Sequence, residues 1–127
     1  MFVLDTNALL AATFRPSQLG KNTSYIVRSS KEIGYSSLSA AELAIKHMLG
    51  KLKLKSTVQT VLSDSQFQEL PFDNQAIAEI YSLPSLVRHE PFDRMILATV
   101  RAYGAKLITS DRKMLDLGFD WILDSSD

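Results

Sequence analysis

The chain has no cysteine, few glycines and prolines, and no long hydrophobic run. The absence of cysteine excludes a disulfide framework and any cysteine-ligated zinc or iron–sulfur site, and it suits a reducing compartment. No apolar stretch approaches the roughly 20 residues that a membrane-spanning helix needs. The segment MFVLD at the start has no basic region before its apolar residues, so we expect no signal peptide. These absences together predict a cytoplasmic protein that is not bound to a membrane.

The remaining composition is that of one folded domain. The chain has 127 residues, of which 46% are hydrophobic and 22% charged, so it is neither a disordered tail nor a membrane protein. The 5 glycines and 4 prolines are scattered, and there is no internal repeat, low-complexity tract or linker. We therefore expect a single domain over residues 1–127.

Charge is distributed unevenly along the chain. The formal net charge is zero, but residues 1–55 carry a net charge of +5 and residues 56–127 a net charge of −5. A domain with a basic face and an acidic pocket would show this pattern. An ordinary domain with uneven surface charge would show it equally well.

Strand-like and helix-like patterns alternate along the sequence. Strands are predicted over residues 2–4, 33–37, 67–70, 106–109 and 121–123. Helices are predicted over residues 8–12, 17–29, 39–49, 56–64, 74–81, 91–103 and 111–117, with Ser17 as the cap of the second. This alternation predicts an α/β fold in which helices cover both faces of a parallel sheet. Such sheets bind ligands beyond the carboxyl ends of their strands.

Four acidic residues fall at strand ends or helix starts. Asp5 follows the first predicted strand directly, and Asp111 follows the strand 106–109 by two residues. Glu42 is expected in the first turn of the helix after the second strand, and Asp93 in the first turn of the helix that Pro91 opens. Three of the four follow strand ends, so we expect them to line the same rim of the sheet.

Each acid also has a purely structural explanation. Ser39 and Glu42 match a capping box, in which Glu42 would accept a hydrogen bond from the Ser39 amide. Asp5 and Asp111 are suitable N-cap residues, and Asp93 would interact favourably with the helix dipole. Taken one at a time, an acid in such a place is more often a cap than a ligand.

Convergence of the four acids favours a metal site. Carboxylates gathered at one rim repel one another, which raises their pKa values or destabilises the fold, and a bound cation removes that penalty. Carboxylates without histidine or cysteine select Mg²⁺ or Mn²⁺. Two such ions about 3.5–4 Å apart can activate water and stabilise the leaving oxygen of a phosphodiester. The sequence therefore predicts metal-assisted phosphodiester hydrolysis, with one or two ions.

At these residues the sequence resembles the PIN-domain ribonucleases, and among them the VapC toxins of bacterial type II toxin–antitoxin pairs. The matching stretches follow the family's order and spacing: LDTNALL (4–10), SAAELAIK (39–46) with GKL (50–52), HEPFDRMILA (89–98) and LITSD (107–111). The resemblance implies a PIN-like three-layer α/β/α sandwich with a short, mostly parallel central sheet.

The resemblance also implies roles for the four acids. It places the catalytic, metal-binding site at Asp5, Glu42, Asp93 and Asp111. Asp5 and Asp93 are expected to be direct metal ligands. Glu42 would ligate through water or position the attacking water, and Asp111 would act through water or at a second ion.

Other residues are implied as neighbours of this site. Asn7, Thr109 and Ser110 would orient a ligand or a water molecule. An RNA backbone could be held by a set of basic residues: Lys46, Lys51, Lys53, Lys55, Arg88 and Arg94. The lysines of residues 51–55 could equally form a solvated loop. Arg94 could contact a phosphate or pair with Glu90, and the role of His89 is open.

The activity implied by the resemblance is that of an Mg²⁺- or Mn²⁺-dependent endoribonuclease. It would cleave tRNA or ribosomal RNA as the toxin of a toxin–antitoxin pair and so inhibit translation and growth. A homodimer and a cognate antitoxin, whose tail crosses the acidic groove, are the implied partners.

Two other classes of protein compete with this hypothesis. One is a non-catalytic PIN-like module that binds RNA or protein; such modules usually lose one of the four acids, whereas this chain has all four. The other is a receiver-like or phosphatase-type domain with an aspartyl nucleophile at Asp5. That scheme usually requires paired acids before the first helix and a lysine at the end of a late strand, but here Asp5 is single and Lys106 begins its strand.

Overall fold

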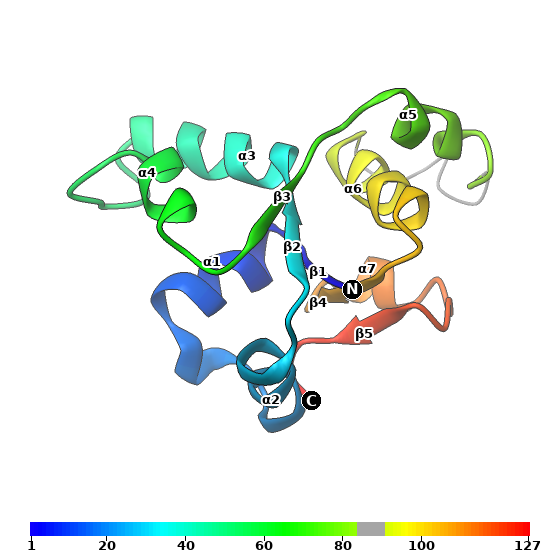
Figure 1. The fold of residues 1–127 in the computed structure, drawn as a ribbon, viewed down its shortest axis with the longest axis horizontal. Coiled ribbons are helices and arrows are strands. Elements are labelled where there is room, and N and C mark those ends of the chain that lie inside the picture. Colours follow the sequence, from blue (N-terminus) through cyan, green and yellow to red (C-terminus); the bar gives the residue numbers. More distant parts are fainter. Residues whose placement is uncertain (84–90) are drawn as a thin grey trace.

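The computed structural model describes residues 1–83 and 91–127 and is built on one five-stranded sheet (Figure 1). All strand pairs are parallel, and the strand order is β3–β2–β1–β4–β5. The strands are β1 (Phe2–Leu4), β2 (Ile33–Ser36), β3 (Gln68–Leu70), β4 (Lys106–Thr109) and β5 (Ile122–Asp124). The predicted α/β class and parallel sheet are confirmed.

Helices connect the strands, as the alternating sequence pattern predicts. They are α1 (Thr6–Phe14), the 3₁₀ turn η1 (Pro16–Gln18), α2 (Lys21–Ser29), α3 (Ser37–Met48), α4 (Val58–Ser63), α5 (Asn74–Ile80), α6 (Pro91–Ala102) and α7 (Arg112–Leu115). Their ends differ by up to a few residues from the predicted ranges. Pro84 and Pro91 predict a loop between them, but that segment lies outside the described residues; α6 begins at Pro91 as expected. None of the described helices is long and apolar enough to cross a membrane.

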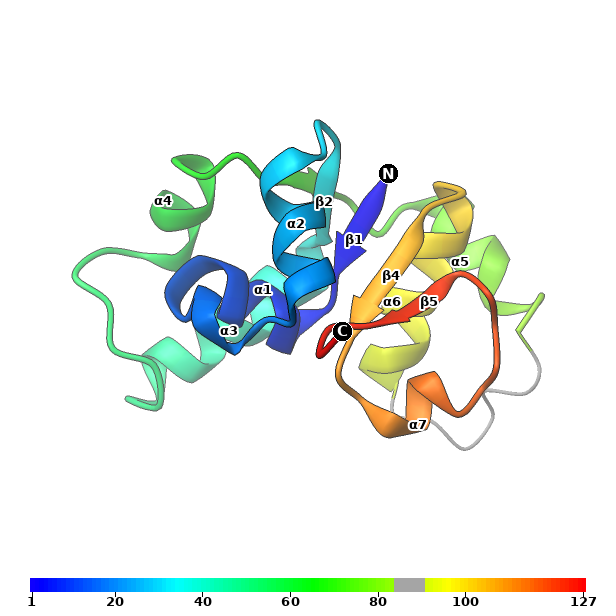
Figure 2. The same cartoon turned by 90° about the horizontal axis from the view of Figure 1, so that it is seen from below.

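The helices form a layer on each face of the sheet (Figure 2). Side chains of adjacent strand residues point to opposite faces. Leu4 and Ile108 pack with α1, α2, α3 and α4 in one buried cluster, while Val3 and Leu107 pack with α5, α6 and α7 in the other. The two clusters make a three-layer α/β/α sandwich, as the resemblance implies.

One predicted helix is wrong in its extent and in its cap. Residues 17–29 do not form a continuous helix: η1 ends at Gln18, and α2 starts at Lys21 after an extended backbone at Leu19 and Gly20. Gly20, and not Ser17, is the N-cap of α2, and no side chain caps this helix. The Gly20 amide donates to the Ser125 carbonyl at 2.9 Å, and a Cβ on Gly20 would lie 2.2 Å from a backbone oxygen of Asp127. This close backbone approach, which requires glycine, interrupts the helix.

The capping box proposed at Ser39 and Glu42 is also wrong. Helix α3 begins two residues earlier, at Ser37, and its N-cap is Ser36, whose hydroxyl accepts from the Leu38 amide at 3.1 Å. Ser39 is fully buried inside the helix and accepts a hydrogen bond from the Thr6 hydroxyl at 3.0 Å. Glu42 consequently lies in the second turn of α3, not the first, and does not cap the helix.

Candidate active site

Two of the predicted acids flank the point where the strand order reverses. From β1 the chain proceeds to β2 and β3 on one side of the sheet and later to β4 and β5 on the other. Asp5 follows β1 and Asp111 follows β4, and these strands are neighbours in the sheet. The Asp5 amide donates to the Ile108 carbonyl at 3.1 Å, which ties the two strand ends together. Open parallel sheets form their ligand-binding crevices at such a reversal.

All four predicted acids line one small pocket at this end of the sheet. The pocket has a volume of about 130 Å³ and is lined by Asp5, Thr6, Asn7, Glu42, Lys46, Asp93, Ile96, Asp111 and Met114. Glu42 comes from α3 and Asp93 from the first turn of α6, and α3 contacts both α1 and α6. Residues far apart in the sequence are thus brought together by the fold.

Asp5 is the most buried of the four acids, with a relative exposure of 5%. One carboxylate oxygen, Oδ1, accepts from the Ala8 amide at 2.8 Å and caps α1, while Oδ2 accepts from the Thr109 hydroxyl. Burial raises the pKa of Asp5 to about 6, the two hydrogen bonds oppose this rise, and the charges of Asp111 and Asp93 add to it. The pocket therefore disfavours a negative charge on Asp5, and a cation would favour it.

Thr109 links two of the acids from beneath the pocket. It is fully buried, and its hydroxyl donates to Asp5 and accepts from the Asp111 amide at 3.0 Å. Asp111 in turn caps α7 by accepting from the Lys113 amide at 2.8 Å. The capping explanation is therefore confirmed for Asp5 and Asp111. It is compatible with a role in the pocket, because each cap fixes the direction of its carboxylate.

The other predicted neighbours lie at different places. Asn7 lines the acidic pocket, whereas Ser110 is exposed and lines a second pocket along α1. Lys46, one helical turn after Glu42, is the one basic residue among the described residues that line the acidic pocket. Lys51 is exposed in the loop after α3, and Arg94 is half-buried but does not line the pocket. Lys53 and Lys55 are exposed in the same loop as Lys51, and the predicted residues Arg88, His89 and Glu90 lie outside the described residues.

Three lining residues were missed in the sequence. Thr6 follows Asp5 directly, Ile96 comes three residues after Asp93, and Met114 comes three residues after Asp111. Residues three apart share one face of a helix, so this spacing could have identified the two apolar residues. Ile96 and Met114 are buried, and they supply the apolar part of the pocket's lining.

The lining of the pocket fits a hard divalent cation in its chemistry. Its donors are carboxylate, hydroxyl and amide oxygens, which Mg²⁺ and Mn²⁺ prefer, and none of the described residues that line it is a histidine. Across residues 1–83 and 91–127, no group of three or more His, Cys, Asp or Glu side chains is already arranged to hold a metal ion. The assignment of individual metal ligands stays a prediction.

Comparison with protein families identifies the fold. The model of the PIN domain family matches residues 2–120. The chain belongs to the PIN-domain family. PIN domains are typically nucleases and are commonly metal-dependent. Comparison with curated protein sequences gave no match.

Solved structures similar to this PIN domain include toxin–antitoxin complexes. A chain of FitAcB from Neisseria gonorrhoeae has a TM-score of 0.68 and 21% identity, over 97% of this chain and 96% of that one. A chain of VapBC2 from Rickettsia felis, bound to a promoter DNA fragment, has a TM-score of 0.67 and 20% identity over 98% and 97%. A chain of DNA-bound VapBC from Salmonella typhimurium has a TM-score of 0.66 and 20% identity over 97% and 95%. At this identity the likeness shows the fold alone.

Proposed function

We propose that this PIN domain, as a single domain over residues 1–127, is an Mg²⁺- or Mn²⁺-dependent endoribonuclease. It would hydrolyse phosphodiester bonds of tRNA or ribosomal RNA in the cytoplasm as the toxin of a toxin–antitoxin pair. The observation that carries the proposal is the convergence of Asp5, Glu42, Asp93 and Asp111 on one pocket of about 130 Å³. Glu42 has no capping role to explain its place there.

The proposed chemistry assigns a task to each acid. A divalent ion bound in this pocket would activate a water molecule and neutralise charge on the scissile phosphate. Asp5 and Asp93 are the proposed direct ligands, with Asp5 held in place by the Ala8 amide and the Thr109 hydroxyl. Glu42 would orient the attacking water, and Asp111 would act through water or at a second ion.

Basic residues beside the pocket would hold the RNA. Lys46 lines the pocket itself, and its ammonium group would contact a phosphate at the site of cleavage. Lys51 lies a short distance beyond the end of α3, and Arg94 directly follows Asp93. Contacts of this kind depend strongly on salt and carry little sequence information.

Protein partners belong to the proposal as well. The similar structures include complexes named as VapBC and FitAcB, and this supports a cognate antitoxin that blocks the acidic pocket. We also propose a homodimer. Ile45, Met48 and Leu49 at the end of α3 have exposed fractions of 53, 88 and 64%, and a partner surface would bury them.

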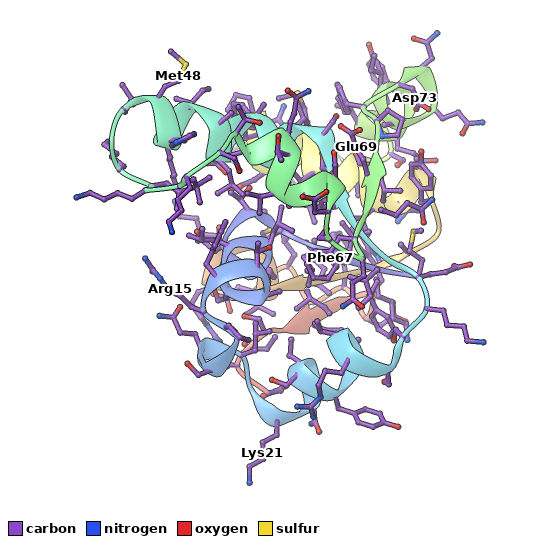
Figure 3. All side chains as sticks on the ribbon, turned by 60° about the vertical axis from the view of Figure 1, so that its left-hand side comes forward. Arg15, Lys21, Met48, Phe67, Glu69 and Asp73 are labelled. Atoms are coloured by element: carbon purple, nitrogen blue, oxygen red, sulfur yellow. The ribbon has the colours of Figure 1, made fainter. Side chains whose placement is uncertain are left out.

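Cleavage of total bacterial RNA by the purified chain tests the proposed activity. The reactions would contain Mg²⁺, Mn²⁺ or EDTA and would compare the wild type with Asp5→Asn and Asp93→Asn. Asp73→Asn is the matched control. Asp73, at the start of α5 (Figure 3), caps that helix by accepting from the Ala76 amide at 3.1 Å, just as Asp5 caps α1, but it is not among the residues that line the acidic pocket. We expect discrete, metal-dependent products from the wild type and from Asp73→Asn only.

Two outcomes would overturn the activity. One is the absence of cleavage by the wild type with every metal, and the other is normal cleavage by a folded Asp5→Asn variant. RNA retention without cleavage would then favour the non-catalytic binding module.

A further inference from the structure

A second pocket continues from the acidic pocket along α1. It has a volume of about 270 Å³ and is lined by Asn7, Ala8, Leu10, Ala11, Arg15, Gln18, Leu19, Ser110, Ser125 and Ser126. Asn7 lines both pockets, and the adjacent residues Ser110 and Asp111 are divided between them. We call this second pocket the α1 groove. One wall is α1 with η1, and the other consists of the segments that follow β4 and β5.

The α1 groove extends away from the carboxylates for the length of a helix. Arg15 is eight positions after Asn7, which corresponds to about 12 Å along α1 at 1.5 Å per residue. A polymer that leaves the acidic pocket past Asn7 therefore reaches Arg15 within a few nucleotides.

The lining of the α1 groove differs from that of the acidic pocket. Among the described residues that line the α1 groove there is no carboxylate side chain, and Arg15 is the one charged residue. Hydroxyl and amide groups supply the other polar surface, and they come from Asn7, Gln18, Ser110 and two serines after β5. Such groups can bond ribose hydroxyls and phosphate oxygens, while the guanidinium of Arg15 suits a phosphate.

Arg15 is available for such a contact. It is exposed, projects from the end of α1 (Figure 3), and forms no ion pair with any residue in the described part of the chain. The opposite wall is held in place, because the Ser125 amide donates to the Thr109 carbonyl at 2.8 Å and its carbonyl accepts from Gly20 at 2.9 Å. The groove is thus formed before any ligand binds.

We propose that the α1 groove binds the RNA chain on one side of the scissile phosphate, with Arg15 pairing with a backbone phosphate. The proposal rests on the endoribonuclease activity proposed above and adds the path of the substrate. Lys46 lies on α3 and Lys51 beyond its end. These lysines would therefore contact the RNA at the site of cleavage and on its other side, and not along α1.

Steady-state cleavage of a short RNA that spans a mapped cut site tests the proposal. The variants are Arg15→Ala and Gln18→Glu, which places a carboxylate beside Arg15 on the exposed turn η1. For both we expect KM to rise about 5- to 10-fold with kcat within about 2-fold of the wild type, because the groove binds RNA away from the reacting bond. The dependence of log KM on log salt should become less steep by about 0.7 in Arg15→Ala, which loses one phosphate contact to a single strand.

Lys31→Ala is the control for loss of a positive charge. Lys31 is exposed just before β2, at the opposite end of the sheet from the acidic pocket, and we expect its KM and salt dependence to match the wild type. If the wild type is active and the KM of Arg15→Ala equals that of the wild type, the proposal that the α1 groove binds RNA is overturned. A protein segment would then be its alternative occupant, while the proposed activity stands. A fall in kcat at constant KM also overturns the proposal, and an inactive wild type overturns it together with the proposed function.

Discussion

At the scale of single residues, structural and functional explanations coincide at the same side chains. Asp5 caps α1, accepts a hydrogen bond from Thr109 and lines the acidic pocket. A cap alone does not need burial, as the exposed Asp73 at the start of α5 shows. The burial of Asp5 beside two other acids places a negative charge where it is costly, and this cost is what separates a binding site from a cap.

The raised pKa of Asp5 predicts how its replacement changes stability with pH. The pKa of Asp5 is about 6 in the folded chain, against 3.8 for the ordinary group. Between pH 3.8 and pH 6 the folded state therefore binds more protons than the unfolded state. Stability therefore falls as pH rises from about 4 to about 6 and stays lower above that, by about 3 kcal/mol for this group. Asp5→Asn lacks this loss. In EDTA, the free energy of unfolding of the variant minus that of the wild type should therefore be larger at pH 7.5 than at pH 4.

Urea unfolding of both chains at the two pH values measures this difference. Asn retains an oxygen that can accept from Ala8, so the cap of α1 is retained. A difference between variant and wild type that is the same at pH 4 and pH 7.5 would contradict the raised pKa.

Thr109 provides a second prediction at this scale. Thr109→Val keeps the shape of the side chain but removes the hydroxyl that joins Asp5 to the Asp111 amide. We expect it to lower the free energy of unfolding by about 1–3 kcal/mol, since buried polar groups lose a partner. We also expect it to reduce RNA cleavage. Thr109→Ser retains the hydroxyl, and its unfolding midpoint and activity should stay near those of the wild type; equal losses in both variants would point to packing instead.

At the scale of elements, the start of a helix decides what its polar residues do. Because Ser36 caps α3, Ser39 is left to pair with Thr6 in the interior, and Glu42 is turned toward the pocket. The interrupted segment before α2 shows the same dependence. Gly20 ends the extended stretch between η1 and α2 because the chain near Ser125 approaches its backbone closely.

This arrangement predicts different costs for two substitutions in and before α3. Ser36→Ala removes the N-cap and should lower the free energy of unfolding by about 1 kcal/mol. Glu42→Gln should leave stability within about 0.5 kcal/mol of the wild type and still abolish RNA cleavage, because Glu42 makes no cap. Urea midpoints and cleavage assays on both variants check this. A loss of about 1 kcal/mol in Glu42→Gln would restore the capping explanation.

At the scale of the whole molecule, the strand order creates the site. β1 and β4 are neighbours although about 100 residues separate Asp5 from Thr109 and Asp111, and α3 and α6 bring Glu42 and Asp93 to the same end. The four acids form a unit only in the folded chain. Any ligand that binds all of them must therefore stabilise the fold.

This linkage predicts stabilisation by metal. Mn²⁺ at 100 times its dissociation constant should raise the free energy of unfolding of the wild type by about 2.7 kcal/mol at pH 7.5. Asp93→Asn should lose most of this increase, and Asp73→Asn should keep it, since Asp73 does not line the pocket. Thermal unfolding followed by circular dichroism at several Mn²⁺ concentrations measures the shift. An equal shift in Asp93→Asn would place the ion elsewhere.

The sequence by itself determined the alternation of strands and helices, the parallel sheet and the four acids at its rim. These follow from local patterns: short β-prone runs such as Phe2–Leu4, helix starts such as Pro91, and acids next to both. Only the tertiary structure decided the strand order, the start of α3 at Ser37 and the break at Gly20. It also decided which polar residues share a pocket. The reason is physical: local preferences depend on neighbours along the chain, whereas burial, close backbone approach and the α1 groove depend on residues that folding brings together.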